Sequence, residues 1–434
     1  MSDLPMFKDL GASAGPAGRE VERAPRIAEP ERGQVRIECS EDLLPASHPA
    51  RLLWDVAGTL DLGPLSEGCE AVEGKAGRRM LSPRMLLTLW MYAVSQAVGS
   101  AREIERLTKD HSGFRWIVGD LKVSHHRLSR FRVSHREAFS QLVTDVLAVL
   151  MEKRLLTLEL VGQDGTRTRA AATAPSFRTY GSLLECRAQA ALHLKAVLAA
   201  AEDPEYTRAQ HAARAAAARD YQQRVEAAIA TVTELQKQKK PGDKLARAST
   251  TDAEARVMKM GDGGFRPALN VQYAVTGSEL GGPRTVVGVQ VTNVGSDMGS
   301  LMPMVEQIEQ RTGKLPVALL ADSGHAKNED IAAVRRQGID VIVPPAETAK
   351  SIETLKQDKG TDPDVLAWRE RMDTEEAQKL YRARAGLAEL NNAHQKTHHG
   401  IQQFLVRGIP KATCVVLLHV LTSNILQHAA NLLA

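Results

Sequence analysis

The sequence is poor in aromatic residues and cysteine, and it contains no long apolar run. Aromatic residues make up 4% of the 434 residues, against 43% hydrophobic and 25% charged residues. With alanine abundant, this composition is typical of a helix-rich globular protein of two or three domains. No uninterrupted apolar stretch reaches the roughly 18 residues of a membrane span, and residues 1–32 lack the apolar core of a signal peptide. We therefore expect a cytoplasmic protein without a membrane partner.

The cysteines form neither a metal-binding nor a disulfide pattern. Cys39, Cys69, Cys186 and Cys414 lie far apart, with no Cys-x-x-Cys pair and no histidine at zinc-finger spacing. Isolated thiols of this kind stay reduced in the cytoplasm and serve in packing. The sequence therefore predicts neither a disulfide-stabilised fold nor a zinc finger.

Positive charge is concentrated in one segment. The net charge of +4 is too mild to indicate nucleic-acid binding by itself. Between residues 101 and 136, however, nine Lys or Arg residues stand against four Asp or Glu residues. This segment is the best candidate for phosphate contacts, although a solvated helical face explains the charge equally well. The arginines that we assign to such contacts are Arg102, Arg106, Arg127, Arg130 and Arg132.

The pattern of apolar residues divides the first third of the chain into two regions. Residues 1–38 are rich in Gly, Pro and charge, which predicts a mobile arm. Residues 39–156 have helical spacing, with helix starts at Ser82, Ser100 and Ser124. Short helices with basic residues on the middle ones suit a DNA reader of the helix-turn-helix kind, and a plain helical bundle fits the pattern equally well.

Residues 157–434 combine strands and helices. A strand from Leu158 ends at Asp164, and a helical insertion follows at about 182–245. Two later strands, 269–275 and 285–291, predict a hairpin. Strands then alternate with helices, which predicts parallel pairing, before two late helical regions. The expected fold class is α/β, a mixed sheet with flanking helices, preceded by an all-α domain.

Two acidic residues end predicted strands. Asp164 ends the strand from Leu158, and Asp322 ends the apolar strand from Val317. Open α/β sheets place ligands outside the carboxyl ends of their strands, so these carboxylates invite a metal ion. Mg²⁺ or Mn²⁺ prefers oxygen ligands, and two ions about 4 Å apart can activate an attacking oxygen and stabilise a leaving one in phosphoryl displacement. The commoner role of Asp after a strand is a turn residue or helix cap.

Three motifs resemble those of insertion-sequence transposases of the DDE type. The run Asp164-Gly-Thr-Arg-Thr-Arg-Ala is similar to their first-Asp motif. Leu319-Leu-Ala-Asp-Ser-Gly-His325 is similar to their second-Asp motif, with His325 where an aromatic residue is usual. Tyr381, Arg384, Glu389 and Lys396 match the Tyr, Arg, Glu and basic positions of their carboxyl-terminal signature. Further similar segments are 83–93, 100–106, 123–126, 249–259, 261–265 and 291–297.

The resemblance carries expectations about fold, site and partners. It implies an RNase H-like core and an amino-terminal helical transposase domain in a bacterial protein associated with the nucleoid. It implies that Asp164, Asp322 and Glu389 are the catalytic residues and hold Mg²⁺ or Mn²⁺, two ions in all. It also implies DNA contacts by Tyr381, Arg384 and Lys396. The implied partners are double-stranded DNA, as the element's terminal repeats and the target, and further copies of the chain.

Spacing along the last signature agrees with these roles in part. Glu389, Lys396 and Gly400 are separated by seven and then four residues, which predicts one helical stripe carrying a metal ligand and a phosphate clamp. Arg384 is five residues before Glu389 and therefore does not share its face in an α-helix. Its guanidinium suits bidentate phosphate contact, and Lys396 suits a point-charge contact.

Two histidines and three further acidic residues suggest other metal sites. His394 and His398 have the spacing of a zinc pair, but no catalytic Glu follows the first His, so imidazoles that face solvent or DNA are the preferred interpretation. Asp252, Asp262 and Asp297 are further acids in matched motifs, and we interpret them as turn residues.

Sequence reasoning therefore predicts a DNA transposase that cleaves element ends and joins them to target DNA by two-metal phosphoryl transfer. Two alternatives remain open at this stage. One is an RNase H-like nuclease that cuts without joining, and the other is a catalytically inactive DNA-binding descendant.

Overall fold

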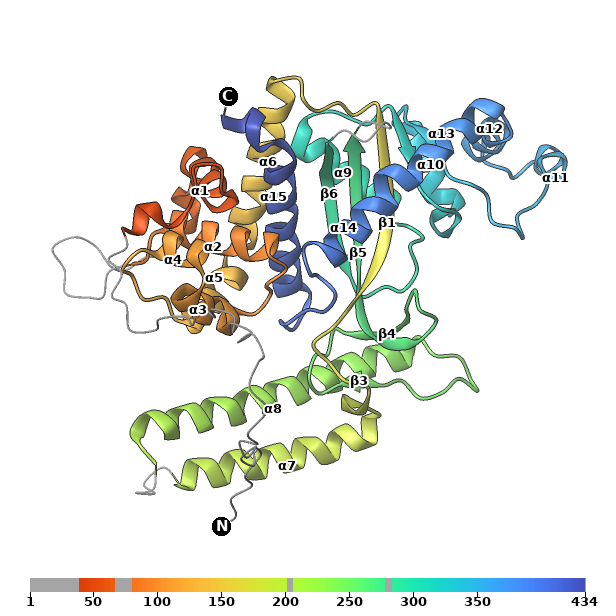
Figure 1. Ribbon diagram of the computed structural model, residues 1–434. Coiled ribbons are helices and arrows are strands. Elements are labelled where there is room, and N and C mark those ends of the chain that lie inside the picture. Colours follow the sequence, from red (N-terminus) through yellow and green to blue (C-terminus); the bar gives the residue numbers. More distant parts are fainter. Residues whose placement is uncertain (1–38, 67–79, 201–205, 278–282, 434) are drawn as a thin grey trace, which may run out of the picture. The chain divides into compact units, whose positions relative to one another are not determined.

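The computed structural model describes residues 39–66, 80–200, 206–277 and 283–433 (Figure 1). Residues Ser40–Ala434 form one compact unit. The arm predicted at residues 1–38 and the thiol of Cys69 lie outside the described residues. Cys39, Cys186 and Cys414 are free thiols.

The amino-terminal region is helical, as predicted. Its elements are η1 (Ser40–Leu43), α1 (Pro49–Thr59), η2 (Gly63–Ser66), α2 (Pro83–Ser95), α3 (Ala101–Asp110), α4 (Ser112–Val118), α5 (His125–Ser134) and α6 (Arg136–Glu152). The predicted caps are confirmed at Ser82 and Ser100, whose hydroxyls each accept a hydrogen bond from a backbone N–H three residues later. Ser124 precedes α5 as predicted, although its side chain makes no capping hydrogen bond.

A mixed sheet of six strands follows in the described part of the chain. The strands are β1 (Leu160–Arg169), β4 (Arg256–Lys259), β5 (Phe265–Gly277), β6 (Arg284–Thr292), β7 (Ala318–Leu320) and β8 (Asp340–Ile342). β5 pairs antiparallel with β1, β4 and β6, while β7 pairs parallel with β1 and β8. The predicted hairpin is therefore β5–β6. Alternation of strands and helices overestimated the share of parallel pairing.

Strand β1 is longer than the sequence indicates. The pattern ended this strand at Asp164, but β1 continues to Arg169 because β5 pairs with it from Val161 through Arg169. The prediction that Asp164 ends its strand is therefore wrong. The parallel partner β7 does stop early, with its last pair at Gly162 and Leu320.

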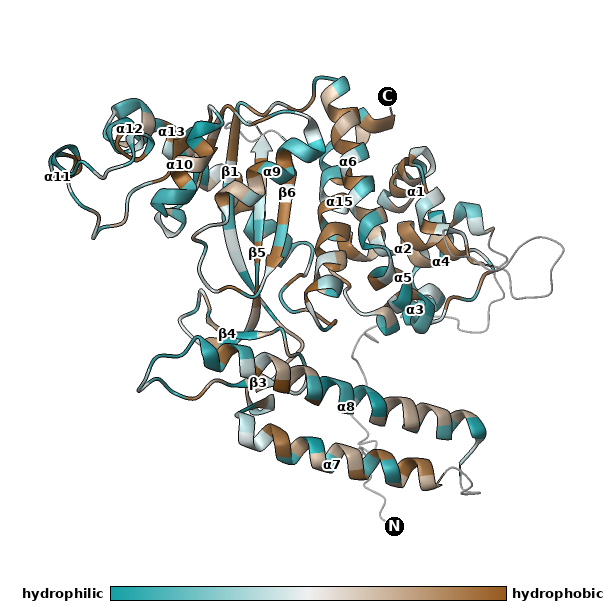
Figure 2. Cartoon of the chain, turned by 180° about the vertical axis from the view of Figure 1, so that it is seen from behind, coloured by the Kyte–Doolittle hydropathy of each residue, from teal (hydrophilic) through white to brown (hydrophobic). Residues whose placement is uncertain are grey.

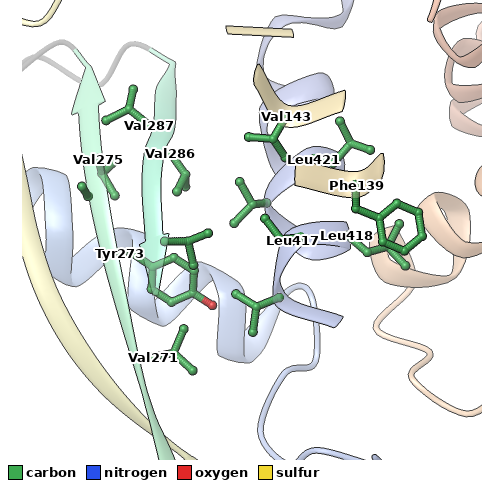
Figure 3. Packing of buried hydrophobic residues seen from close by; sticks show 14 of the residues in the cluster. Phe139, Val143, Val271, Tyr273, Val275, Val286, Val287, Leu417, Leu418 and Leu421 are labelled. Carbon is green, nitrogen blue, oxygen red and sulfur yellow. The ribbon is translucent and has the colours of Figure 1, made fainter. Parts of the chain in front are cut away.

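Helices cover the sheet, and the last one joins it to the amino-terminal helices. They are α9 (Leu301–Thr312), η5 (Ser323–His325), α10 (Asn328–Arg336), α11 (Ile352–Gln357), α12 (Pro363–Met372), α13 (Glu375–Arg384), η6 (Ala385–Glu389), α14 (Leu390–Thr397) and α15 (Ile409–Leu433). α15 packs against β6 and also against α1, α2, α5 and α6. In Figure 3, Leu417 of α15 lies between Val286 of the sheet and Phe139 of α6.

This shared core explains the stability of the unit. Each fully buried leucine, valine or phenylalanine contributes about 1.5–3 kcal/mol. Apolar residues concentrate on α15 and on the strands in Figure 2. α15 is the one helix in the described part of the chain that is long and apolar enough to cross a membrane, and 72% of its most apolar window is buried inside the protein. Such burial is typical of a core helix.

The expected helical insertion corresponds to a pair of antiparallel helices. α7 (Tyr180–Ala199) and α8 (Arg208–Lys237) pack along each other and are bracketed by two short paired strands, β2 (Phe177–Arg178) and β3 (Ala248–Ser249), with η3 (Ala174–Ser176) ahead of β2. They have a small core of their own, made by Leu183, Ala228, Val232, Ala246 and Ala248.

Candidate active site

The register of the sheet brings two predicted site residues together. Gly162 and Leu320 are the last parallel pair between β1 and β7. Asp164 and Asp322 each lie two residues further along, so they occupy neighbouring positions just beyond the last parallel pair. Asp164 stays in β1, where it pairs with Tyr273 of β5. Asp322 follows β7 and caps the short helix η5. The two carboxylates therefore come from strands that adjoin each other in the sheet.

The two carboxylates have different environments. Asp164 is largely buried, and its pKa is raised, first by burial and then by the negative charge of Asp322. The pKa of Asp322 is lowered, above all by its hydrogen bond with His325. Two carboxylates that repel each other inside a partly buried site are stabilised by a bound cation, which is the chemistry that a divalent metal supplies.

An unusual helical turn brings Glu389 to the neighbourhood of Asp164 and Asp322. Residues Ala385–Glu389 form a π-turn between α13 and α14. Because a π-turn has hydrogen bonds from residue i to i+5, it aligns residues five apart. Arg384 and Glu389 accordingly form an ion pair. The expectation that these two side chains cannot share a face, which assumed α-helical geometry, is wrong here.

A glycine and an arginine hold the π-turn against the sheet. A methyl group on Gly162 would lie 3.1 Å from Leu387 Cβ, so the missing side chain lets the turn approach β1. Arg284 donates a hydrogen bond from Nε to the Gly386 carbonyl at 2.7 Å. π-turns are rare and occur frequently at functional sites.

Arg384 stands among all three carboxylates. Its side chain is 14% exposed, pairs with Glu389, and has Nη1 3.9 Å from Asp164 Oδ2. Burial alone would lower the pKa of Arg384, but the charges of Tyr381, Asp164, Glu389 and Asp322 raise it overall. Within the described residues, no three Asp, Glu, His or Cys side chains are close enough to hold a metal ion together. Glu389 faces the guanidinium instead of the two aspartates.

The donor set nevertheless fits a divalent cation. All three side chains offer carboxylate oxygens, the ligands that Mg²⁺ and Mn²⁺ prefer. Both hydrogen bonds to Asp322 go to Oδ1, from Gly324 N at 3.0 Å and His325 Nδ1 at 2.7 Å, which leaves Oδ2 available. Glu389 is half exposed and can turn away from Arg384.

The other residues of the carboxyl-terminal signature lie around this centre. The Tyr381 ring centroid is 5.5 Å from the Arg384 guanidinium. Lys396 is half-buried on α14 and interacts electrostatically with Asp164 and Arg167, while burial lowers its pKa. Gly400 lies beyond the end of α14 at Thr397, so the predicted stripe stops at Lys396.

The five arginines expected to face phosphates divide into two groups. Arg102, Arg106 and Arg130 are exposed, and Arg127 is partly exposed. Arg132 differs from this expectation, because its side chain is 5% exposed and stacks on Trp90 at 4.5 Å. It donates a hydrogen bond to the Gly99 carbonyl at 2.6 Å.

Sequence reasoning missed several polar neighbours of the two aspartates. Asn392, which is 8% exposed, donates a hydrogen bond from Nδ2 to Asp164 Oδ2 at 3.0 Å. Its place three residues after Glu389, on the same helical face, was the available signal. Gln272 carried no signal in the sequence. Asp297 was interpreted as a turn residue, but it is buried in a hydrogen-bond network next to the site.

The other histidines and acids considered in the sequence make local contacts of their own. The rings of His394 and His398 contact each other, tilted by 32° with centroids 4.9 Å apart. Asp252 is buried and accepts hydrogen bonds from Glu254 N and Gly408 N, and Asp262 is exposed and paired with Arg266. Asp262 therefore organises a local turn, whereas Asp252 joins its own loop to the segment at Gly408.

Two families of known domains match the chain. A transposase domain family (DUF772) matches residues 38–134, which contain the helices α1 to α5. A transposase DDE domain family matches residues 350–429, which contain the π-turn and Glu389. No curated protein and no solved structure matched. The two aspartate motifs, at Asp164 and Asp322, lie between the two matched domains, and the motif with Glu389 lies inside the second one. The two matches together support an insertion-sequence transposase of the DDE type.

Proposed function

We propose that this transposase cleaves DNA at the ends of its element and joins them to target DNA, with Asp164, Asp322 and Glu389 as the catalytic carboxylates. The observation that carries the proposal is the gathering of these three side chains around Arg384, from positions 158 and 67 residues apart in the sequence. A structural ion pair would need only one of the carboxylates.

The topology of the sheet supports an RNase H-like core. Three antiparallel strands, β6, β5 and β1, are followed across the sheet by the parallel strands β7 and β8. The two aspartates lie just beyond the last parallel pair of β1 and β7, where the antiparallel and parallel halves of the sheet meet. Helices on the faces of a mixed sheet agree with this architecture.

The residues of the site would divide the work as follows. Asp164, Asp322 and Glu389 would hold two Mg²⁺ or Mn²⁺ ions, and such ions would supply activation of the attacking oxygen and stabilisation of the leaving oxygen of the phosphodiester. Asn392 and the backbone N–H of Gly165 orient the Asp164 carboxylate. Arg384, once it leaves Glu389, and Lys396 would bind phosphates of the strand being cut.

We assign the recognition of terminal DNA to the helical region. Arg102, Arg106, Arg127 and Arg130 are at least partly exposed there, and phosphate contacts of this kind release counterions and give salt-sensitive affinity. Two element ends must be held at once, so we also propose that the active complex contains more than one copy of the chain.

The test uses double-stranded DNA that carries the sequences flanking the gene, with their inverted repeats. Asp164→Asn, Asp322→Asn and Glu389→Gln should each abolish Mg²⁺- or Mn²⁺-dependent strand cleavage while DNA binding and folding persist, because an amide keeps the size but loses the ligand charge. Ca²⁺ should permit binding without chemistry, since its coordination is looser.

Matched controls come from the same chain. Glu159→Gln, at the exposed start of the sheet region, and His394→Ala, on α14, should leave cleavage unchanged. Cleavage that survives Asp322→Asn would refute the proposed site. If His394→Ala lost both its activity and a bound zinc ion, the active site would have to be reassigned to the histidines. Products joined to a second DNA separate a transposase from a nuclease that only cuts.

A further inference from the structure

A continuous chain of buried polar groups runs from Asp297 to Asp322. The side chain of Asp297 is 7% exposed and accepts hydrogen bonds at Oδ1 from Gln272 Nε2 at 2.6 Å and Asn270 Nδ2 at 2.7 Å. Gln272 is 1% exposed, and its Oε1 is 3.2 Å from His325 Nε2. His325 is fully buried and reaches Asp322 Oδ1 from Nδ1 at 2.7 Å.

Asp297 fixes the orientation of the Gln272 amide. A carboxylate only accepts, so the amide nitrogen of Gln272 must face Asp297 and its oxygen must face His325. Nδ1 of His325 donates to the carboxylate of Asp322, which only accepts, and Nε2 of the same ring lies 3.2 Å from Gln272 Oε1. Without Asp297 the amide of Gln272 could turn over, so that its nitrogen instead of its oxygen would face His325.

The hydrogen-bonded groups between Asp297 and Asp322 occupy space that a side chain at residue 165 would fill. A methyl group on Gly165 would lie 2.5 Å from Asp297 Oδ1 and would collide with the Gln272 amide. Glycine next to Asp164 is therefore what allows the network to pass behind that residue. A buried carboxylate is expensive unless it is paired, and Asp297 is compensated by Arg167 Nη2 at 3.0 Å and by the two amides.

We infer that Asp297, Gln272 and His325 are positioning residues that aim the Asp322 carboxylate at the catalytic metal. The inference rests on the proposed function. His325 and the Gly324 N–H together hold Oδ1, so that the other oxygen, Oδ2, points away from the network and is free to act as a single ligand. Partners that orient a ligand in this way commonly change metal affinity by about 10–100-fold when they are removed.

The experiment measures Mn²⁺ binding by the full chain, from the paramagnetic resonance signal of the free ion. Gln272→Met and His325→Leu keep the volume but lose the hydrogen bonds, and each should weaken Mn²⁺ binding about 10–100-fold. His325→Asn keeps a donor near the position of Nδ1 and should recover most of the affinity. Rescue of this kind separates positioning from a general loss of packing.

A second buried histidine provides the control. His428 on α15 is 3% exposed and is hydrogen-bonded to Thr285 at 2.7 Å, remote from this chain of groups. His428→Leu should lower the melting temperature about as much as His325→Leu does and leave the Mn²⁺ affinity unchanged. If Gln272→Met bound Mn²⁺ as tightly as the wild type, this inference would be overturned, while the proposed metal site would stand. Wild-type chain that shows no saturable Mn²⁺ binding would overturn the proposed metal site and this inference with it.

Discussion

Two arginines on α5 show how differently one residue type is used. Arg130 is exposed, whereas Arg132 is buried between Trp90 and the Gly99 carbonyl, and burial lowers its pKa to about 10. Arg132→Met should therefore destabilise the fold by about 2 kcal/mol in urea unfolding, because the Gly99 carbonyl loses a charged donor. Its effect on DNA affinity should be small.

Arg130→Met should do the reverse. Stability should change little, while the slope of log affinity against log salt for duplex DNA should fall by about 0.9, the contribution of one lost phosphate contact. An equal change at exposed Arg219 on α8 is the control and should leave the slope as it is. A steeper loss of DNA affinity for Arg132→Met than for Arg130→Met would contradict this assignment.

At the level of single residues the sequence pointed to Asp164 and Asp322 through the motifs that contain them, although Asp164 does not end its strand. Asn392 could have been found from its place three residues after Glu389. Gln272 could not, because its contacts depend on which segments the fold brings together. Arg132 was counted with the exposed arginines because a local excess of positive charge does not reveal burial.

The fit between β1 and the π-turn can be tested at Gly162. A methyl group there would approach Leu387 Cβ to 3.1 Å, which a small shift can relieve, whereas a branched side chain cannot be accommodated. Gly162→Ala should reduce the rate of cleavage moderately, and Gly162→Val should abolish it by pushing Glu389 away from Asp164. Overpacking of this kind also costs about 1–3 kcal/mol, measurable by urea unfolding.

Gly386→Ala is the control for this pair. In the structure a methyl group at that position meets no atom within 4 Å, so cleavage should be little affected. Full activity in Gly162→Val would mean that the close approach of the turn to β1 does not position Glu389.

Among the elements, helix starts were predictable and strand ends were not. Local signals, such as a serine before the first turn, are present in the sequence itself and gave the starts of α2 and α3. The end of β1 depends on β5, which lies about 100 residues later and keeps supplying hydrogen bonds up to Arg169. The π-turn left no mark that periodicity could detect, because it breaks the 3.6-residue repeat on which that reasoning rests.

Two buried histidines make the stability of the whole unit depend on pH. His399 and His419 are 4% and 6% exposed, and burial lowers their pKa values to about 3 and about 4. The unfolded chain binds protons at these groups from about pH 6.5 downward, and the folded chain does not. Stability should thus be complete above pH 6.5 and fall as the pH drops, by roughly 1 kcal/mol per pH unit and histidine.

Urea unfolding between pH 4.5 and 7.5 measures this dependence. The double variant His399→Gln, His419→Gln should flatten the profile, although its stability at pH 7.5 should be lower. His126→Gln, at an exposed position, should leave the profile unchanged. A double variant with the same slope as the wild type would show that other groups cause the acid sensitivity.

The sequence predicted two domains with a boundary near residue 156, and the helical and sheet regions do follow that order along the chain. It could not predict that α15, more than 250 residues later, would pack on α1, α2, α5 and α6 as well as on β6. Contacts between such distant segments have no local signature. A fragment that starts at residue 151 would expose one face of α15, so single substitutions are the better way to locate DNA affinity.

The π-turn also has a consequence for comparing this chain with its relatives. One residue more or less between Arg384 and Glu389 turns everything after it by roughly 100° about the helix axis. A relative with a regular α-helix at this place would need one residue fewer to present the same acid. An alignment without a gap there would set Ala388 against that relative's glutamate and score an intact site as a broken one. Counting the residues of this turn is therefore necessary before any copy is judged inactive.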